Sequence, residues 1–195
     1  MTEPAKTRSL NGTRAATNDR LLNACSEIII RSGFKAVSMS KIAEEAGLTR
    51  QTVYRYFKNK RAIITATIGR AAAEVLEAQY QVLRESGEPR DIVIKLVLTS
   101  LHTIRTKTLF IRALESGGSP QADMVSNVSL LFAERSIEAL RSIGDRVDWD
   151  EQERREVNEI LVRYIMSYLI MPHHTGSESA LRADLYKRMV PALGL

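Results

Sequence analysis

Hydrophobic residues recur along the chain at the three- and four-residue spacing of amphipathic helices. Leu22, Cys25 and Ile29 follow this spacing and predict a first helix from about residue 18 to residue 32. Gly33 follows directly, and glycine commonly ends a helix there in a left-handed conformation. No stretch of useful length alternates apolar and polar residues as a half-buried strand does. The pattern therefore predicts an all-α protein.

Two short helices are predicted after the first. Ser38 is a good N-cap for a helix over residues 39–46. Gly47 then permits a tight turn, and Thr49 is available as the N-cap of a helix over residues 50–57. Two short helices separated by so few residues are typical of a helix-turn-helix unit.

The remaining chain also has a helical pattern. Asn59 can cap a long helix that starts near Lys60 and reaches the breakers Ser86 and Gly87. Residues 92–98 are apolar nearly all round, which predicts a central, buried helix. That helix would run from Pro89 to about residue 107. Further helices, for about nine in all, are expected at 109–115, from 119 to near 144, at 150–171 after a capping box of Asp148 and Glu151, and at 177–190.

Positive charge is concentrated in the first third of the chain. The whole sequence has 28 Lys and Arg against 23 Asp and Glu, yet residues 1–61 hold twelve basic and only five acidic residues. A basic module on a nearly neutral body suggests binding to a polyanion. On charge alone, a solvated basic face without a partner is equally compatible.

Composition excludes several classes of protein. A single cysteine, Cys25, cannot form an internal disulfide or a cysteine-rich zinc site. No apolar run approaches the roughly 20 residues that span a bilayer, and the N-terminus lacks the apolar stretch of a secretory signal. We therefore expect a soluble cytoplasmic protein without a membrane partner.

Catalytic and metal-binding motifs are not found in the sequence. It has no nucleophile elbow, no zinc-protease motif and no phosphate-binding glycine loop. His173 and His174 are adjacent in an expected loop, where their side chains diverge, so solvated histidines are favoured over a zinc site. The sequence thus predicts neither an enzyme nor a cofactor.

Residues 39–57 satisfy the packing needs of a helix-turn-helix. Ala43 supplies a small residue where the helices cross, Gly47 supplies the turn, and Val53 supplies an apolar anchor. Arg50 and Gln51, which open the second helix, can read base edges bidentately in the major groove. The coincidence of this spacing with the predicted caps and the basic region favours DNA binding.

Residues 19–64 resemble the N-terminal DNA-binding domain of the tetracycline-repressor (TetR) family of transcriptional regulators. The similarity covers about a quarter of the chain. One departure is Arg61, where the family often has an acidic residue. The resemblance is carried by residues 22–25, 31–39, 42–48 and 52–60.

The resemblance implies a role for each matching residue. Arg50, Gln51 and Thr52 would face bases and nearby phosphates, and Tyr54 and Tyr56 would contact phosphates, although the two tyrosines also fit the rim of the small core. The remaining implied DNA contacts are Ser38, Ser40 and Lys41 at the start of the second helix and Lys60 at the start of the fourth.

The family resemblance also implies three regions along the chain. These are a flexible basic arm (1–17), a DNA-binding domain (18–64) and an effector-binding and dimerisation domain (65–195). Apolar residues of the last region fit a pocket for a lipophilic effector, or equally a closed core. His102, on the helix expected to be buried, is more commonly a satisfied core residue than a ligand contact. The candidate pocket residues are Leu98, His102, Phe110, Leu114, Phe132 and Ile165.

A second stripe of large side chains in the last two predicted helices fits a two-fold four-helix dimer interface. An ordinary core stripe is the alternative. The candidate interface residues are Val157, Leu161, Tyr164, Tyr168, Leu181, Leu185 and Met189.

We therefore expect a transcriptional regulator. A homodimer would bind a pseudo-palindromic operator in double-stranded DNA, and a small-molecule effector of unknown identity would release it. Two alternatives remain open from the sequence. One is a helical ligand- or partner-binding protein that does not bind DNA specifically, and the other is an enzyme with an unrecognised site in the helical domain.

Overall fold

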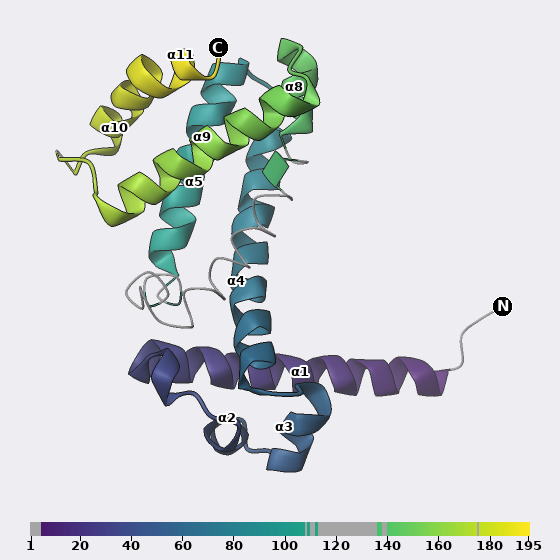
Figure 1. Ribbon diagram of the computed structural model, residues 1–195. Helices are drawn as coiled ribbons and strands as arrows, with labels where there is room; N and C mark the ends of the chain where they lie inside the picture. The colour runs from purple at the N-terminus through teal and green to yellow at the C-terminus, as the bar shows by residue number, and fades with distance from the viewer. Residues whose placement is uncertain (1–4, 108, 110–111, 113–135, 138–139, 175) are drawn as a thin grey trace. The chain divides into compact units, whose positions relative to one another are not determined.

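The computed structural model describes residues 5–107, 109, 112, 136–137, 140–174 and 176–195. Every regular element within these residues is helical (Figure 1), which confirms the all-α prediction. The elements are α1 (Ala5–Ser32), the 3-10 helix η1 (Phe34–Ala36), α2 (Met39–Glu45), α3 (Arg50–Tyr56), α4 (Lys60–Leu83), α5 (Pro89–Thr106), α8 (Arg141–Val147), α9 (Glu151–Ile170), α10 (Glu178–Asp184), the π-helical segment η2 (Leu185–Met189) and α11 (Val190–Ala192).

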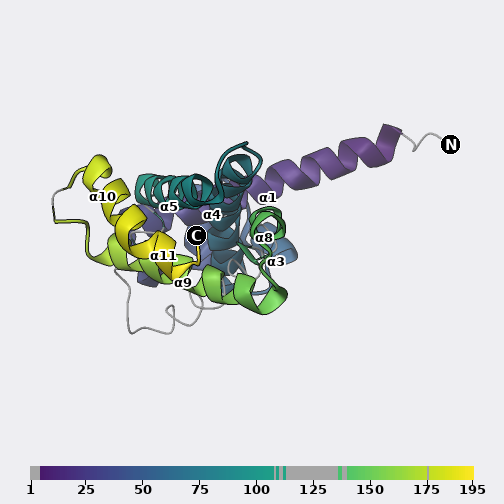
Figure 2. The ribbon, with the colours of Figure 1, turned by 90° about the horizontal axis from the view of Figure 1, so that it is seen from above.

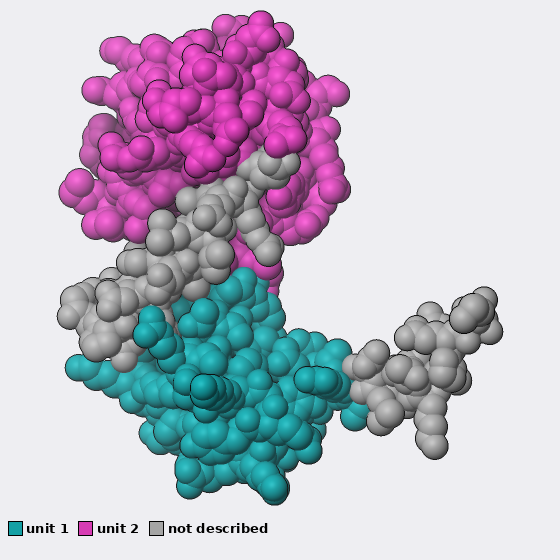
Figure 3. Space-filling model, turned by 45° about the vertical axis from the view of Figure 1, so that its right-hand side comes forward, with its two compact units in different colours: residues 1–71, 109–125 teal, residues 72–108, 126–195 magenta. Residues whose placement is uncertain are grey.

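The chain divides into two compact units, which Figure 3 distinguishes by colour. Unit 1 comprises residues 1–71 and 109–125, and unit 2 comprises residues 72–108 and 126–195. The boundary between the units falls within α4, so one continuous helix contributes to both. The functional division at residue 64 remains a prediction.

Unit 1 is built on the apolar face of α1. Cys25 is fully buried there, and burial raises the pKa of its thiol to about 11, so Cys25 is a neutral core residue, as the sequence indicates. Gly33 has a φ of 75°, and its N–H donates to the Ile29 carbonyl at 2.8 Å. The core of unit 1 includes Leu21, Cys25, Ile29, Phe34, Ile42, Val53, Ile63, Ile64 and Ile68.

The expected flexible arm over residues 1–17 is wrong for most of its length. Helix α1 begins at Ala5 rather than near residue 18. Pro4 suits the position directly before a helix, and the following residues are largely good helix formers. Gly12, the one glycine there, costs a helix only about 1 kcal/mol.

Helix α5 is the centre of unit 2. It packs against α8, α9, α10, η2 and α11, and in both ribbon views α9 and α10 lie close to it (Figures 1 and 2). Val93, Ile94 and Val97 are inaccessible to solvent, which confirms the predicted buried helix. Lys95 points outward and forms an ion pair with Glu85.

The start of α9 differs in detail from the prediction. Asp150 and Glu153 form the capping box: the Glu153 N–H donates to Asp150 Oδ1, and the Asp150 N–H donates to Glu153 Oε2, each at 2.8 Å. Asp148, the predicted cap, instead adopts a left-handed φ of 58° and ends α8. It is occupied there because the Trp149 N–H closes the preceding turn onto the Gly144 carbonyl.

Two predicted helices fall largely outside the described residues. These are the helices expected at 109–115 and from 119 to near 144, of which the structure shows α8 at the end of the second. Among the described helices, none combines the length and the apolar composition that crossing a membrane requires.

Tyr168 on α9 provides a pH-dependent contact with α10. Its hydroxyl donates to Asp184 Oδ2 at 2.7 Å. Burial, followed by this hydrogen bond, raises the pKa of Tyr168 from 10.0 to about 12. Because the pKa is higher in the folded state, the stabilisation is complete below pH 10 and is lost as pH rises through 12.

We expect the Tyr168→Phe variant to lose less unfolding free energy than the wild type between these two pH values. Urea unfolding monitored by circular dichroism at several pH values measures the difference. Identical pH dependence in the two proteins would contradict the assignment.

Candidate nucleic-acid interface and effector cavity

The turn between α2 and α3 is fixed by backbone geometry and by one arginine. Gly47 adopts a φ of 60°, which glycine reaches without steric cost. The Leu48 N–H donates to the Ala43 carbonyl at 2.9 Å. Arg20 on α1 donates to the Ala46 carbonyl at 2.7 Å and so ties the turn to α1. Ala43 and Val53 are buried, as the motif requires.

Side-chain caps start all three helices at this end of unit 1. Ser38 Oγ accepts from the Lys41 N–H at 3.2 Å, and Thr49 Oγ1 accepts from the Thr52 N–H at 3.1 Å. Asn59 Oδ1 accepts from the Ala62 N–H at 2.9 Å. The three predicted N-caps are confirmed, so local sequence sets where α2, α3 and α4 begin.

Loss of the Thr49 cap is expected to destabilise unit 1. In Thr49→Ala the Thr52 N–H loses its acceptor, and the expected cost is about 1 kcal/mol of unfolding free energy. Urea unfolding measures this cost, and Thr49→Ser, which retains the hydroxyl, serves as the control. Equal stability of the alanine variant and the wild type would contradict the capping role.

The outer face of α3 presents polar side chains. Arg50 and Gln51 are exposed, and Tyr54 is 49% exposed. Thr52 and Tyr56 are half-buried, so the rim position considered for the tyrosines applies to Tyr56 more than to Tyr54. Together these side chains form a polar surface that a base-reading helix needs.

Basic and hydroxyl groups flank this face on neighbouring elements. Ser40 and Lys41 are exposed at the start of α2, while Ser38 is half-buried. Lys60 begins α4 and donates to the Lys35 carbonyl at 3.5 Å. The positive end of the α4 dipole and Lys60 coincide there, an arrangement that favours phosphate.

Three residues that support this face were not singled out in the sequence. Arg20 braces the turn, and Arg31 on α1 pairs with Glu45 on α2, NH2 to Oε2, at 2.6 Å. The hydrogen bond from Arg31 lowers the pKa of the Glu45 carboxyl. Arg20 and Arg31 are eleven residues apart, which returns a helix to nearly the same face. That spacing is the signal that could have identified the two arginines.

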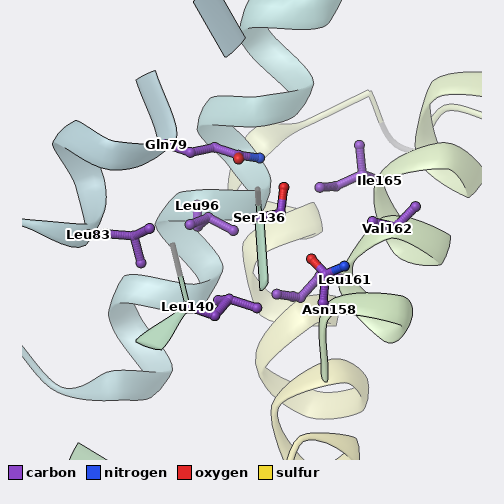
Figure 4. Close-up of a pocket in the computed structure, with 9 residues that line it drawn as sticks. All are labelled: Gln79, Leu83, Leu96, Ser136, Leu140, Asn158, Leu161, Val162 and Ile165. Carbon is purple, nitrogen blue, oxygen red and sulfur yellow. The ribbon is translucent and has the colours of Figure 1, made fainter. Parts of the chain in front are cut away.

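Unit 2 encloses a small cavity between α4, α5 and α9 (Figure 4). Its volume of about 10 Å³ is close to what one water molecule occupies. The lining residues are Gln79, Leu83, Leu96, Ser136, Leu140, Asn158, Leu161, Val162 and Ile165.

The predicted effector residues have different outcomes. Ile165 lines the cavity, whereas Leu98 packs against the core without lining it. His102 is exposed, so its expected burial is wrong. It follows Asp91, Lys95 and Leu98 at helical spacing, along the outer edge of α5. Phe110, Leu114 and Phe132 lie outside the described residues.

Most of the residues predicted to form the dimer interface belong to the core of unit 2. Five of them are at most 6% exposed and cannot contact a second chain, so their assignment is corrected. Periodicity identifies a buried face but not the surface that covers it, and here the covering surface is intramolecular. The five are Val157, Leu161, Leu181, Leu185 and Met189, and the half-buried Tyr164 and Tyr168 pack against the same core.

Exposed apolar residues lie on the opposite face of α9. Met166 is 37% exposed and Ile170 is 66% exposed. They continue a helical stripe that begins with Glu159 and Arg163, which form an ion pair within the helix. Tyr186 on η2 is a further exposed large apolar residue of unit 2.

Comparison with known proteins gives matches at the level of both sequence and fold. The family described as "Bacterial regulatory proteins, tetR family" matches residues 21–67. An uncharacterised HTH-type transcriptional regulator of Mycobacterium tuberculosis, MT2310, is 27% identical over 108 residues, which is 55% of each chain. The chain thus spans about half the length of this relative.

Solved structures of low sequence identity share the fold. The TetR-family repressor AlkX of Dietzia sp. superposes with a TM-score of 0.62 at 18% identity, covering 91% of this chain and 95% of AlkX. SmeT in complex with triclosan superposes with a TM-score of 0.61 at 16% identity, covering 88% and 90% of the two chains. The family's proteins are transcriptional regulators rather than enzymes. The matched helix-turn-helix and the shared fold identify the chain as a member of the TetR family of bacterial regulatory proteins.

Proposed function

We propose that the protein is a transcriptional repressor that binds a pseudo-palindromic operator as a homodimer and leaves it when a small effector binds. The observation that carries this proposal is the polar outer face of α3, which is held by the buried Val53 and by the Thr49 cap. Fixed side chains of this kind can read base edges because the helix itself is positioned by the core.

On this proposal, Arg50 and Gln51 contact bases in the major groove. Bidentate contacts of Arg to guanine and of Gln to adenine are the common pairings. Tyr54, exposed on the same helix, and Lys41, at the start of α2, bind phosphates. Ser38, Ser40, Thr52, Tyr56 and Lys60 complete the proposed DNA contacts.

Two half-sites require two copies of α3, and the exposed face of α9 fits a second copy of this chain. In a two-fold interface the same surface pairs with itself. Glu159 and Arg163 are adjacent on one stripe, so antiparallel copies of α9 can place the acid of one protomer beside the base of the other. Met166 and Ile170, farther along the stripe, supply the apolar contact.

Effector binding is proposed to act through α4. Lys60 begins this helix in unit 1, and Gln79 and Leu83 line the cavity of unit 2 near its other end. A ligand that favours one position of α4 therefore changes the placement of Lys60. A coupling of about 1–3 kcal/mol corresponds to a change in DNA affinity of about 5–150-fold. The SmeT complex supports a ligand site in this fold, because SmeT binds triclosan.

Selection from random-sequence DNA tests the proposed function. The full chain is incubated with the DNA pool, and bound sequences are amplified and sequenced over several rounds. Enrichment of an inverted repeat with half-sites about one helical turn apart supports the proposal. Absence of any enriched sequence would favour the helical binding protein that does not recognise DNA specifically.

A further inference from the structure

Gln79 has an orientation that the hydrogen-bond network determines. The side chain is 3% exposed and extends from α4 into the lining of the cavity (Figure 4). Gln79 Nε2 donates to Ser100 Oγ at 2.9 Å, and Ser100 Oγ donates to the Leu96 carbonyl at 2.7 Å. A hydroxyl has one proton, so Ser100 can only accept from Gln79. The amide nitrogen therefore faces Ser100, and the carbonyl oxygen Oε1 is the group left for other contacts.

The Gln79 carbonyl oxygen is an acceptor in an apolar setting. No residue that the structure describes is seen to donate to it. A buried acceptor without a partner is unfavourable, and the cavity has space for about one water molecule. A ligand that displaces such a water must bring its own donor, or the hydrogen bond is lost.

The described lining of the cavity contains no ionisable side chain. Ser136 and Asn158 are neutral polar residues, and the other lining residues besides Gln79 are aliphatic. A carboxylate placed here loses its hydration without gaining a cation from these residues, which is costly. It would also approach the partial negative charge of Gln79 Oε1.

Building on the proposed effector response, we propose that the effector is a neutral molecule with an apolar body and a hydroxyl or N–H donor. Gln79 Oε1 accepts the hydrogen bond from that donor, and the aliphatic side chains of α4, α5 and α9 contact the body. Gln79 therefore selects for a donor group, and Ser100 positions Gln79 for this role.

Three simple probes separate the donor from size and charge. 1-Octanol and heptyl methyl ether are isomers, and only the alcohol has a donor. Octanoate has the same chain length and is ionised at about pH 8. Calorimetric titration of the full chain is expected to show 1-octanol binding about tenfold more tightly than the ether. Octanoate is expected to bind at least about tenfold more weakly than 1-octanol.

Variants assign the preference to Gln79. Gln79→Met has a similar shape without the acceptor, and it should bind the two isomers with affinities within about twofold of each other. Gln81→Met, an exposed position on the same helix, is the matched control and should keep the preference for 1-octanol. If Gln79→Met does not fold, the isomer comparison in the wild type decides alone.

Four results would overturn the inference: no binding of 1-octanol, equal binding of the two isomers by the wild type, tighter binding of octanoate, or retention of the preference in Gln79→Met. DNA binding is measured separately by gel shift on the selected sequence. A protein that binds its operator but shows none of these ligand preferences contradicts the inference alone. A protein that selects no operator contradicts the proposed function, and the calorimetry still reports on the cavity.

Discussion

Replacement of both Arg50 and Gln51 by alanine is expected to lower the affinity for the selected operator by at least about 100-fold, because each bidentate base contact contributes about 1–3 kcal/mol of discrimination. Both side chains are exposed on α3, so the fold should not change. Binding to unrelated DNA should persist, since Lys41 and Lys60 still attract phosphates. Fluorescence anisotropy with labelled operator and scrambled DNA measures both affinities.

The matched control is the double variant Gln81→Ala/Arg84→Ala. These two residues have the same chemistry and are exposed on α4 within unit 2. We expect this variant to bind the operator as the wild type does. Retention of operator preference by the Arg50 and Gln51 variant would contradict base reading by α3, whatever the control shows.

Ile170→Glu is expected to convert the dimer into a monomer and to reduce operator affinity by about 100-fold or more, because the two half-sites are then bound independently. Ile170 is 66% exposed in the single chain, so a glutamate there leaves the core of unit 2 intact. In the proposed dimer the two glutamates would be buried close to the two-fold axis, where like charges are unfavourable.

Sedimentation velocity at micromolar concentration measures the oligomeric state of this variant, and circular dichroism verifies its helix content. Ser142→Glu adds the same charge at an exposed position of α8 and should remain dimeric. A dimeric Ile170→Glu protein, or a wild type that is monomeric at these concentrations, would contradict the proposed α9 interface.

Local signals in the sequence predicted the helix-turn-helix well. Ser38, Thr49 and Asn59 cap the helices they precede, because capping depends on residues within one turn. Gly33 and Gly47 adopt the left-handed conformations that their positions suggested. These features are determined by short stretches of chain, and so they could be read without knowledge of the tertiary structure.

Features that depend on tertiary packing were predicted less well. The stripe containing Leu161 and Leu185 is apolar because it is buried within unit 2, and the sequence does not distinguish this from a subunit interface. His102 was expected to be buried because it follows an apolar run, but one helical position separates it from the buried face of α5. Gln79 and Asn158, which line the cavity from different helices, come together only through the fold.

A titration of the full chain against the selected operator and a scrambled sequence, over a range of salt concentrations, tests the central claim most directly. The account predicts two protomers per operator, a preference of at least about 1,000-fold over scrambled DNA, and an affinity that falls linearly with salt on logarithmic axes, with a slope of about −0.9 per neutralised phosphate. Equal affinity for the two sequences at every salt concentration would contradict the account.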